Sequence, residues 1–256
     1  MSNGLNDSVI GDGPDVVLLH GLFGQGANMG GLARVLQADF RVHCVDLPDH
    51  GHSEWSKGVI SIAAYAEQLA GWMDARHMTR AHWVGHSLGG KVAMALALAA
   101  PAYVDRLVVA DIAPVAYAPG HDRVFAGLAA VAQANCQTRQ QAAAILEEYV
   151  DEPGVIQFLL MSLTRDLDGL FRWRLNHEGL AGAYDQLRAE VDYEQPFDGK
   201  VLLIRGELSD YVRPEHEGAM LARFPHTEMC TIAGAGHWLH AERPGEFNPL
   251  VANFLL

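Results

Sequence analysis

The segment Gly85-His86-Ser87-Leu88-Gly89 decides the fold, because it fits the pattern G-x-S-x-G between a strand-like run and a helix-like run. A tight strand-to-helix turn would hold the serine in a strained backbone conformation and expose its hydroxyl at the carboxyl edge of a sheet. Side chains at the two glycine positions would collide with neighbouring backbone. The start of the helix behind the serine favours developing negative charge. We therefore predict that Ser87 is a nucleophile.

Outward from this turn, short β-rich runs alternate with longer helical patterns. This alternation predicts an α/β fold with a mostly parallel, twisted sheet flanked by helices. The predicted strands cover residues 16–20, 40–46, 81–85, 107–110, 201–204 and 228–232. The predicted helices cover residues 28–38, 60–76 and 88–100, and a last helix interrupted by Pro244 and Pro249 covers the C-terminus.

The alternation stops between residues 119 and 195, where helical patterns follow one another without strands. Val124, Leu128 and Val131, for example, share one face of a helix. We expect a helical cap inserted over one end of the sheet. The core domain then has a first part at residues 1–118 and a second part at 196–256, with the cap or lid at 119–195.

Composition narrows the class of protein. The chain has 256 residues, half of them hydrophobic and 19% charged, which fits one packed α/β domain with an insertion. A net charge of −13 argues against binding to nucleic acid or to anionic membranes. The N-terminus lacks the pattern of a signal peptide, and no apolar run reaches a membrane span of about 20 residues. Three scattered cysteines, Cys44, Cys136 and Cys230, indicate reduced thiols and a cytoplasmic location. The oligomeric state is left open.

An oxyanion-binding loop is predicted after the first buried strand, in the sequence HGLFG at residues 20–24. Acyl transfer places negative charge on the substrate oxygen, and two backbone N–H groups must point at it. We assign these groups to Leu88, which follows the nucleophile, and to Leu22, with Phe23 as the alternative to Leu22. His20 is expected to brace the loop.

The general base is expected in the sequence GAGHW at residues 234–238, after the last predicted strand. His237 lies late in the chain, as the order serine, acid, histidine requires in this fold, and flanking glycines suit a sharp loop. His86 should point away from the site. His237 and His240 are spaced as a metal pair but lack an evident third ligand, so we predict no metal.

Two carboxylates are candidates for the acid, the group that orients the histidine and stabilises its charged form. The acid usually follows the penultimate strand, but Ser209 occupies the expected position there and Asp210 is displaced by one residue. Asp111 follows another strand, at residues 107–110. It can also reach the ring nitrogen of His237 that faces away from Ser87, and so fix the tautomer of the imidazole. We favour Asp111 and keep Asp210 as the alternative.

At these residues the chain resembles the α/β-hydrolase superfamily of serine hydrolases, and within it the YbfF-type bacterial esterases. The matching segments include LLHGLFG (18–24), VGHSLGGKVAM (84–94), ADIAPVAY (110–117), GVIQFLL (154–160) and AGAGHWLHAE (233–242). The resemblance implies that the acid is the aspartate of the D-I-x-P-V segment, which is Asp111. Asp49 stands where the superfamily often has glycine, which leaves the proposed triad intact.

The resemblance and the site residues together predict a carboxylic ester hydrolase that acts on short- to medium-chain acyl esters through an acyl-enzyme, with no cofactor. Phe23, Trp238 and Tyr117 are expected to line the substrate pocket, and the expected partner is a small-molecule ester. An alternative is an acyl-CoA thioesterase, in which cap arginines meet the CoA phosphates. These arginines are Arg165, Arg172 and Arg174. A second alternative is a ligand receptor with slow hydrolysis.

Overall fold

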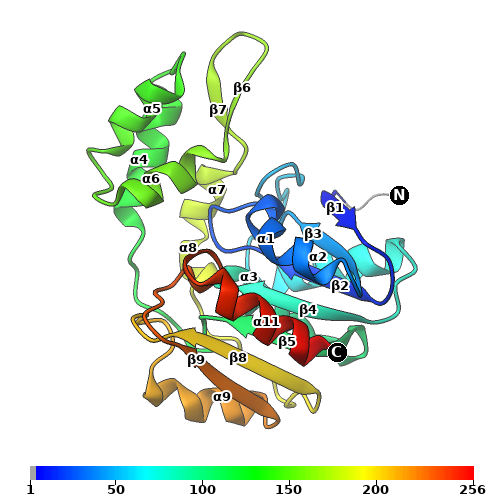
Figure 1. Ribbon diagram of the computed structural model, residues 1–256. Coiled ribbons are helices and arrows are strands. Elements are labelled where there is room, and N and C mark those ends of the chain that lie inside the picture. The colour runs from blue at the N-terminus through cyan, green and yellow to red at the C-terminus, as the bar shows by residue number, and fades with distance from the viewer. Residues whose placement is uncertain (1–3) are drawn as a thin grey trace.

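The computed structural model describes residues 4–256, and a twisted sheet forms its centre (Figure 1). The strand order is β1-β3-β2-β4-β5-β8-β9, and all neighbours pair in parallel except β1 and β3. The strands are β1 (Asp7–Ile10), β2 (Asp15–Leu19), β3 (Arg41–Val45), β4 (Ala81–His86), β5 (Val104–Ala110), β8 (Lys200–Gly206) and β9 (Thr227–Ile232). The predicted mostly parallel sheet is therefore confirmed, while the antiparallel edge strand β1 was missed.

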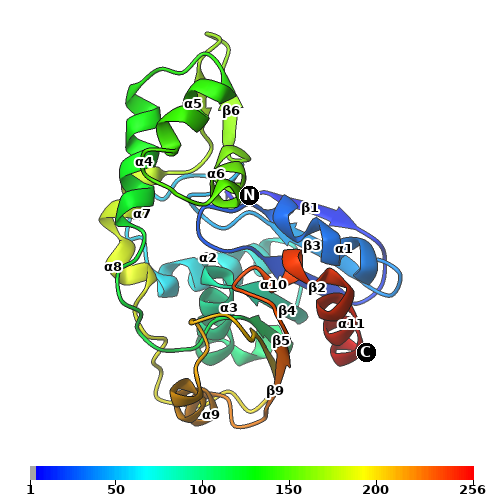
Figure 2. The same ribbon diagram turned by 60° about the vertical axis from the view of Figure 1, so that its left-hand side comes forward.

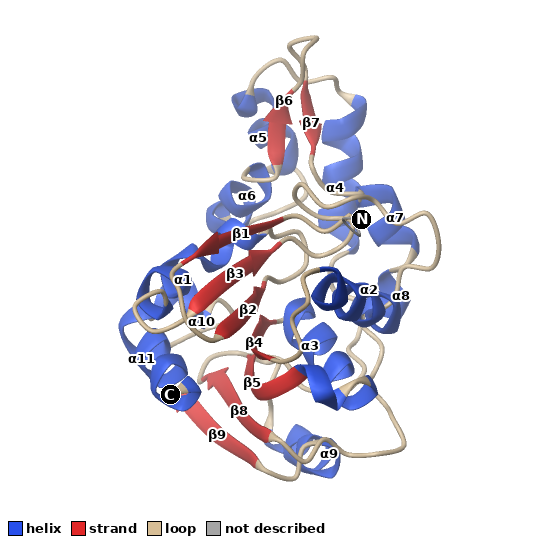
Figure 3. Ribbon diagram, turned by 90° about the vertical axis from the view of Figure 1, so that its right-hand side faces the viewer, coloured by secondary structure: helices blue, strands red, loops and turns tan. Residues whose placement is uncertain are grey.

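Helices cover both faces of this sheet (Figure 3). One face carries α1 (Gly30–Leu36), α10 (Leu239–Glu242) and α11 (Pro244–Leu255). The other carries α2 (Ile62–Ala75), α3 (Leu88–Ala99) and α9 (Glu217–Arg223). Short 3-10 turns lie at Gly26–Met29, Pro101–Tyr103 and Pro214–His216.

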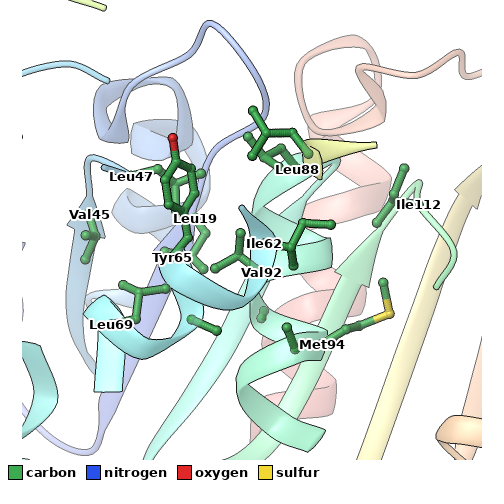
Figure 4. Close-up of a cluster of buried hydrophobic side chains, with 14 of the residues drawn as sticks. Leu19, Val45, Leu47, Ile62, Tyr65, Leu69, Leu88, Val92, Met94 and Ile112 are labelled. Atoms are coloured by element: carbon green, nitrogen blue, oxygen red, sulfur yellow. The ribbon is translucent and has the colours of Figure 1, made fainter. Parts of the chain in front are cut away.

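The strands divide their side chains between two hydrophobic cores, as the period of two in a strand requires. Val17 and Leu19 of β2 belong to the core under α2 and α3, whereas Val16 and Leu18 belong to the core under α1 and α11. Figure 4 shows part of the first core, where Tyr65 of α2 lies beside Leu19. Helix α3 is buried along nearly its whole length, so the turn that precedes it is held firmly.

A segment inserted between β5 and β8 stands above the sheet, as Figures 1 and 2 show. It contains α4 (Asp122–Gln133), α5 (Arg139–Leu146), α6 (Pro153–Leu160), β6 (Leu163–Arg165), β7 (Phe171–Trp173), α7 (His177–Gly182) and α8 (Tyr184–Leu187). The first three of these helices form its outer part together with the hairpin of β6 and β7.

This hairpin corrects the expectation that the insertion has no strands. β6 and β7 pair antiparallel, and their turn places Gly169 at φ 86°, a conformation that favours glycine. The indole N–H of Trp173 donates to the carbonyl of Leu128 at 2.8 Å, which fixes β7 on α4. The strands have three residues each, too few to show a period of two in the sequence.

The expected C-terminal helix is present as α11, which begins at Pro244 and continues through Pro249 without interruption. Phe247, Val251 and Leu255 lie buried on one side of it, and this packing outweighs the hydrogen bond that proline cannot make. Among residues 4–256, no helix is both long and apolar enough to cross a membrane.

Candidate active site

Ser87 lies in the turn between β4 and α3, with φ 52° and ψ −118°. A positive φ is costly for a residue with a side chain, and such strain is typical of functional sites. The flanking glycines are needed for close packing. A Cβ at Gly85 would lie 2.3 Å from the carbonyl oxygen of Gly89, and a Cβ at Gly89 would lie 2.6 Å from the carbonyl oxygen of Leu19. No side chain fits at either position.

The structure brings Ser87, His237 and Asp111 together. His237 Nε2 lies 3.0 Å from Ser87 Oγ, and His237 Nδ1 lies 2.7 Å from Asp111 Oδ2. With Nδ1 protonated, the imidazole donates to the carboxylate and Nε2 is free to accept the serine proton. The arrangement can therefore activate a hydroxyl nucleophile.

Asp111 follows the last residue of β5 and is fully buried, at 0% exposure. Its Oδ1 accepts a hydrogen bond from the backbone N–H of Gly206 at 2.9 Å, and the hydroxyl of Ser209 donates to Oδ2. These donors, together with His237, satisfy a charge that would otherwise be costly to bury.

The alternative acid, Asp210, lies elsewhere. Its side chain is 90% exposed and forms an ion pair with Arg213 at 3.3 Å. Ser209, at the position where the acid usually stands, instead donates a hydrogen bond to Asp111. The loop after β8 thus contributes a hydroxyl group to the site in place of a carboxylate.

The loop of residues 20–24 lies against the nucleophile, since a Cβ at Gly21 would lie 3.2 Å from Ser87 Cβ. The N–H of Phe23 is engaged, because it donates to His50 Nε2 at 3.3 Å. For the N–H groups of Leu22 and Leu88, the structure of residues 4–256 records no hydrogen-bond acceptor. Of the two alternatives in this loop, Leu22 therefore has the available donor.

Two buried histidines brace this loop. His20 donates from Nδ1 to the carbonyl of Gly21 at 2.8 Å and accepts at Nε2 from the N–H of Leu47 at 3.0 Å. Burial and the neighbouring His50 lower the pKa of His20 to about 3, so the ring is neutral. His50 donates in the same way to the carbonyl of Pro48 at 2.8 Å.

His86 does not point away from the site as expected. Its Nε2 donates to the backbone carbonyl of His237 at 2.9 Å, and its ring centre lies 4.8 Å from that of His237. Burial and the nearby His240 keep the pKa of His86 well below its usual range. A strand residue that precedes a sharp turn can direct its side chain sideways along the sheet edge, which the alternation of a regular strand does not predict.

The site opens into a cavity of about 1540 Å³ between the sheet edge and the inserted segment. Phe23, Trp238 and Tyr117, the predicted lining residues, all border it. Trp238 packs against Phe158 of α6 with ring centres 5.5 Å apart. The Tyr117 hydroxyl is engaged within the protein, because it accepts from the N–H of Ala113 and donates to the carbonyl of Tyr211. Tyr117 can therefore offer its ring to a substrate, with its hydroxyl already bonded.

Two further residues of the cavity wall, Tyr211 and Lys91, were not predicted from the sequence. Tyr211 stacks on His237, and nothing in its immediate sequence marks it. Lys91, one helical turn after Ser87, is buried at 2% exposure. The sequence could have pointed to Lys91, because it is a lysine in an otherwise apolar helix, and a buried lysine needs a specific set of hydrogen-bond acceptors.

Comparisons with known proteins identify the family and agree with the fold. Residues 16–250 match the family described as "Alpha/beta hydrolase family". The chain is 44% identical to "Esterase YbfF" of Escherichia coli K12, over 90% of this chain and 88% of that protein. It is 37% identical to the "sn-1-specific diacylglycerol lipase" of Mus musculus, over 94% of this chain and 81% of that protein. A solved structure titled "Marine microorganism esterase" superposes with a TM-score of 0.94 at 32% identity, covering 98% of this chain and 99% of that one.

Proposed function

The chain belongs to the alpha/beta hydrolase family, and from that premise we propose that it is a carboxylesterase with a Ser87–His237–Asp111 triad that acts on short- to medium-chain acyl esters. The chain is a serine ester hydrolase, as its relatives over nearly the full length indicate. The residue roles and the substrate range are our proposal. The observation that carries it is the continuous hydrogen-bonded path from Ser87 Oγ through the imidazole to a buried carboxylate.

In the proposed mechanism, His237 Nε2 takes the proton of Ser87 Oγ as the oxygen attacks the ester carbonyl. The N–H groups of Leu22 and Leu88 donate to the resulting oxyanion, and the N-terminus of α3 adds to this stabilisation. His237 then protonates the leaving alcohol. A water molecule deprotonated by the same imidazole hydrolyses the acyl-enzyme, and Asp111 stabilises the imidazolium in both steps.

The cavity supports the proposed substrate range. Its wall combines apolar side chains of the core, such as Phe23, with those of α4 and α6, such as Val124 and Phe158. We propose that residues 119–195 act as a cap that closes the acyl pocket from above. A small-molecule ester as the partner and a cytoplasmic location also stay predictions.

The acyl-CoA alternative required cap arginines that are free to bind the CoA phosphates, and the structure does not favour it. Arg172 is paired with Asp166 at 3.1 Å and also with Asp168, and neither Arg172 nor Arg174 borders the cavity. A phosphate would have to displace these carboxylates. No observation favours the receptor alternative over hydrolysis.

The test is an assay of the purified protein on p-nitrophenyl esters from acetate to palmitate, with Ser87→Ala as the control. We expect turnover to be highest at a short or medium chain and to vanish in the variant. Activity that survives Ser87→Ala would refute the nucleophile. Acyl-CoA substrates assayed in parallel would reveal a thioesterase if they, and no oxygen ester, are hydrolysed.

A further inference from the structure

Tyr211 makes the closest ring contact with the proposed base that the structure records. It lies in the loop after β8, and its ring stacks on the imidazole of His237 with centres 3.9 Å apart and planes 20° from parallel. By comparison, His86 lies 4.8 Å from the same ring at 42°. A near-parallel stack at this distance covers one face of the imidazole.

The backbone of Tyr211 is fixed on both sides. Its carbonyl accepts from the Tyr117 hydroxyl at 2.7 Å and from His216 Nδ1 at 3.2 Å, and its N–H donates to Ser209 Oγ at 3.2 Å. Within the described residues, no hydrogen bond is recorded for its own hydroxyl. The ring is therefore placed by the backbone and by packing, without help from its phenol oxygen.

The ring face is negative and the imidazole becomes a cation during the reaction. An aromatic face attracts a cation within about 6 Å of its centre, and more strongly when water is excluded. The attraction is absent for the neutral imidazole of the ground state and present for the imidazolium of the transition state. Interactions of this kind accelerate the chemical step.

We propose that Tyr211 is a positioning residue that fixes the plane of the His237 imidazole and stabilises its cationic form through the aromatic face. This inference rests on the proposed function, since it requires His237 to be the base. Tyr211 acts on the reaction through His237, and its ring, not its hydroxyl, carries the effect.

Several other titratable groups also face His237. Asp111 at the end of β5 bonds to His237 Nδ1, and Glu242 accepts from the N–H groups of Gly236 and Trp238. Burial lowers the pKa of His240 in α10 to about 4 and also lowers the pKa of His86 in β4 and of His121 before α4. Burial thus favours the neutral form of these three imidazoles. All three stay in place in the Tyr211 variants, so a difference between those variants reports on Tyr211.

The experiment compares Tyr211→Phe with Tyr211→Leu. Phenylalanine keeps the ring, whereas leucine keeps an apolar cover without the aromatic face. We expect Tyr211→Phe to retain wild-type kcat/KM within about twofold. We expect Tyr211→Leu to lose roughly 3- to 30-fold, with the acid limb of its kcat/KM profile moved to lower pH by roughly half a unit to one unit. Tyr149→Leu, which removes another tyrosine from the cavity wall, should leave the midpoint of the acid limb unchanged.

The same variants should be labelled with a small fluorophosphonate as a function of pH, because this probe reacts at Ser87 without filling the acyl pocket. A shift of the acid limb in this reaction separates an effect on the base from a lost substrate contact. If Tyr211→Leu does not fold, Tyr211→Met replaces it with the same expectation.

Equal pH profiles for the Phe and Leu variants would overturn the inference, and so would a loss in Tyr211→Phe as large as in Tyr211→Leu. The proposed function fails separately, if His237→Ala or Ser87→Ala retains wild-type turnover in the protein with Tyr211 intact.

Discussion

Ser87 and Asp111 share a backbone conformation that residues with side chains seldom adopt, since φ is 52° at both. They also occupy equivalent positions. His86 of β4 pairs with Ala110 of β5, so Ser87 and Asp111 are each the first residue beyond neighbouring strands. The N–H of Ser87 donates to the carbonyl of Ala110 at 3.1 Å, which continues the ladder into the turn. Two strained residues at one sheet edge direct their side chains to the same histidine, and the firmly packed sheet maintains the strain.

The buried acid gives a prediction at a single residue. Asp111→Asn should lower kcat by about 10³- to 10⁴-fold, because an amide no longer holds the imidazole in the tautomer that accepts the serine proton. Steady-state kinetics on a p-nitrophenyl ester measure it. Asp210→Asn is the matched control and should leave kcat within about twofold, since its side chain is exposed and paired with Arg213. The opposite ranking would transfer the role of acid to Asp210.

Among single residues, the sequence predicted those site residues that lie directly beyond the end of a strand or in the loop after it. Ser87, Asp111 and His237 each come directly after a strand or in the loop that follows one, and the carboxyl ends of parallel strands meet at one edge. The contacts of His86 and Tyr211 could not be predicted in this way. They depend on the direction of a side chain in a turn or a loop, which is set by tertiary packing and has no period.

Among the elements, the long helices and buried strands were predictable because they repeat a pattern over many residues. Helix α2 and strand β8 lie within a few residues of their predicted bounds. The hairpin of β6 and β7 and the edge strand β1 were not predictable, since they are short and depend on contacts with distant segments, such as the pairing of β1 with β3 and the bond from Trp173 to Leu128. The bounds of a cap at 119–195 stay a proposal.

Helix α6 provides a prediction about acyl-chain length. Phe158 lines the cavity and packs on Trp238, which follows the proposed base. Phe158→Ala should enlarge the pocket and raise the ratio of kcat/KM for octanoate over butyrate esters roughly threefold or more, because each methylene that gains apolar contact favours binding. The measurement is a chain-length series on both proteins. Val59→Ala, at an exposed position, is the control and should leave the ratio unchanged. A uniform loss across all chain lengths would contradict a role in chain selection.

In the molecule as a whole, the core holds both connections to the inserted segment through one buried lysine. Lys91 Nζ donates to the carbonyl of Val115, in the connection from β5 to α4, and to the carbonyls of Arg188 and Ala189, in the connection from α8 to β8. It also lies 4.8 Å from the centre of the Tyr117 ring. Among residues 4–256, no ion pair with a carboxylate is recorded for it. The connections also bond to each other, since the N–H of Tyr117 donates to the carbonyl of Arg188. The position of the inserted segment is therefore tied to α3, the helix that also begins directly after Ser87.

Burial lowers the pKa of Lys91 to about 7, and this makes the contribution of the lysine to stability depend on pH. The unfolded chain keeps its lysine protonated up to about pH 10, so between about pH 7 and 10 unfolding takes up a proton and the folded state gains stability as pH rises. Lys91→Met lacks this gain. The variant also leaves the carbonyls of Val115 and Ala189 without a donor, whereas the carbonyl of Arg188 still accepts from the N–H of Tyr117. We expect the variant to be about 1–3 kcal/mol less stable near neutral pH.

The difference from wild type should widen further toward about pH 9, by up to about 2 kcal/mol. Urea unfolding of both proteins at about pH 7 and about pH 9 measures it, and groups common to the two proteins cancel. A difference that is the same at both pH values would mean that the three carbonyl acceptors keep Lys91 charged throughout. Limited proteolysis should then still cut the connections near Val115 and Ala189 faster in the variant, because the charged lysine would tie the inserted segment to α3.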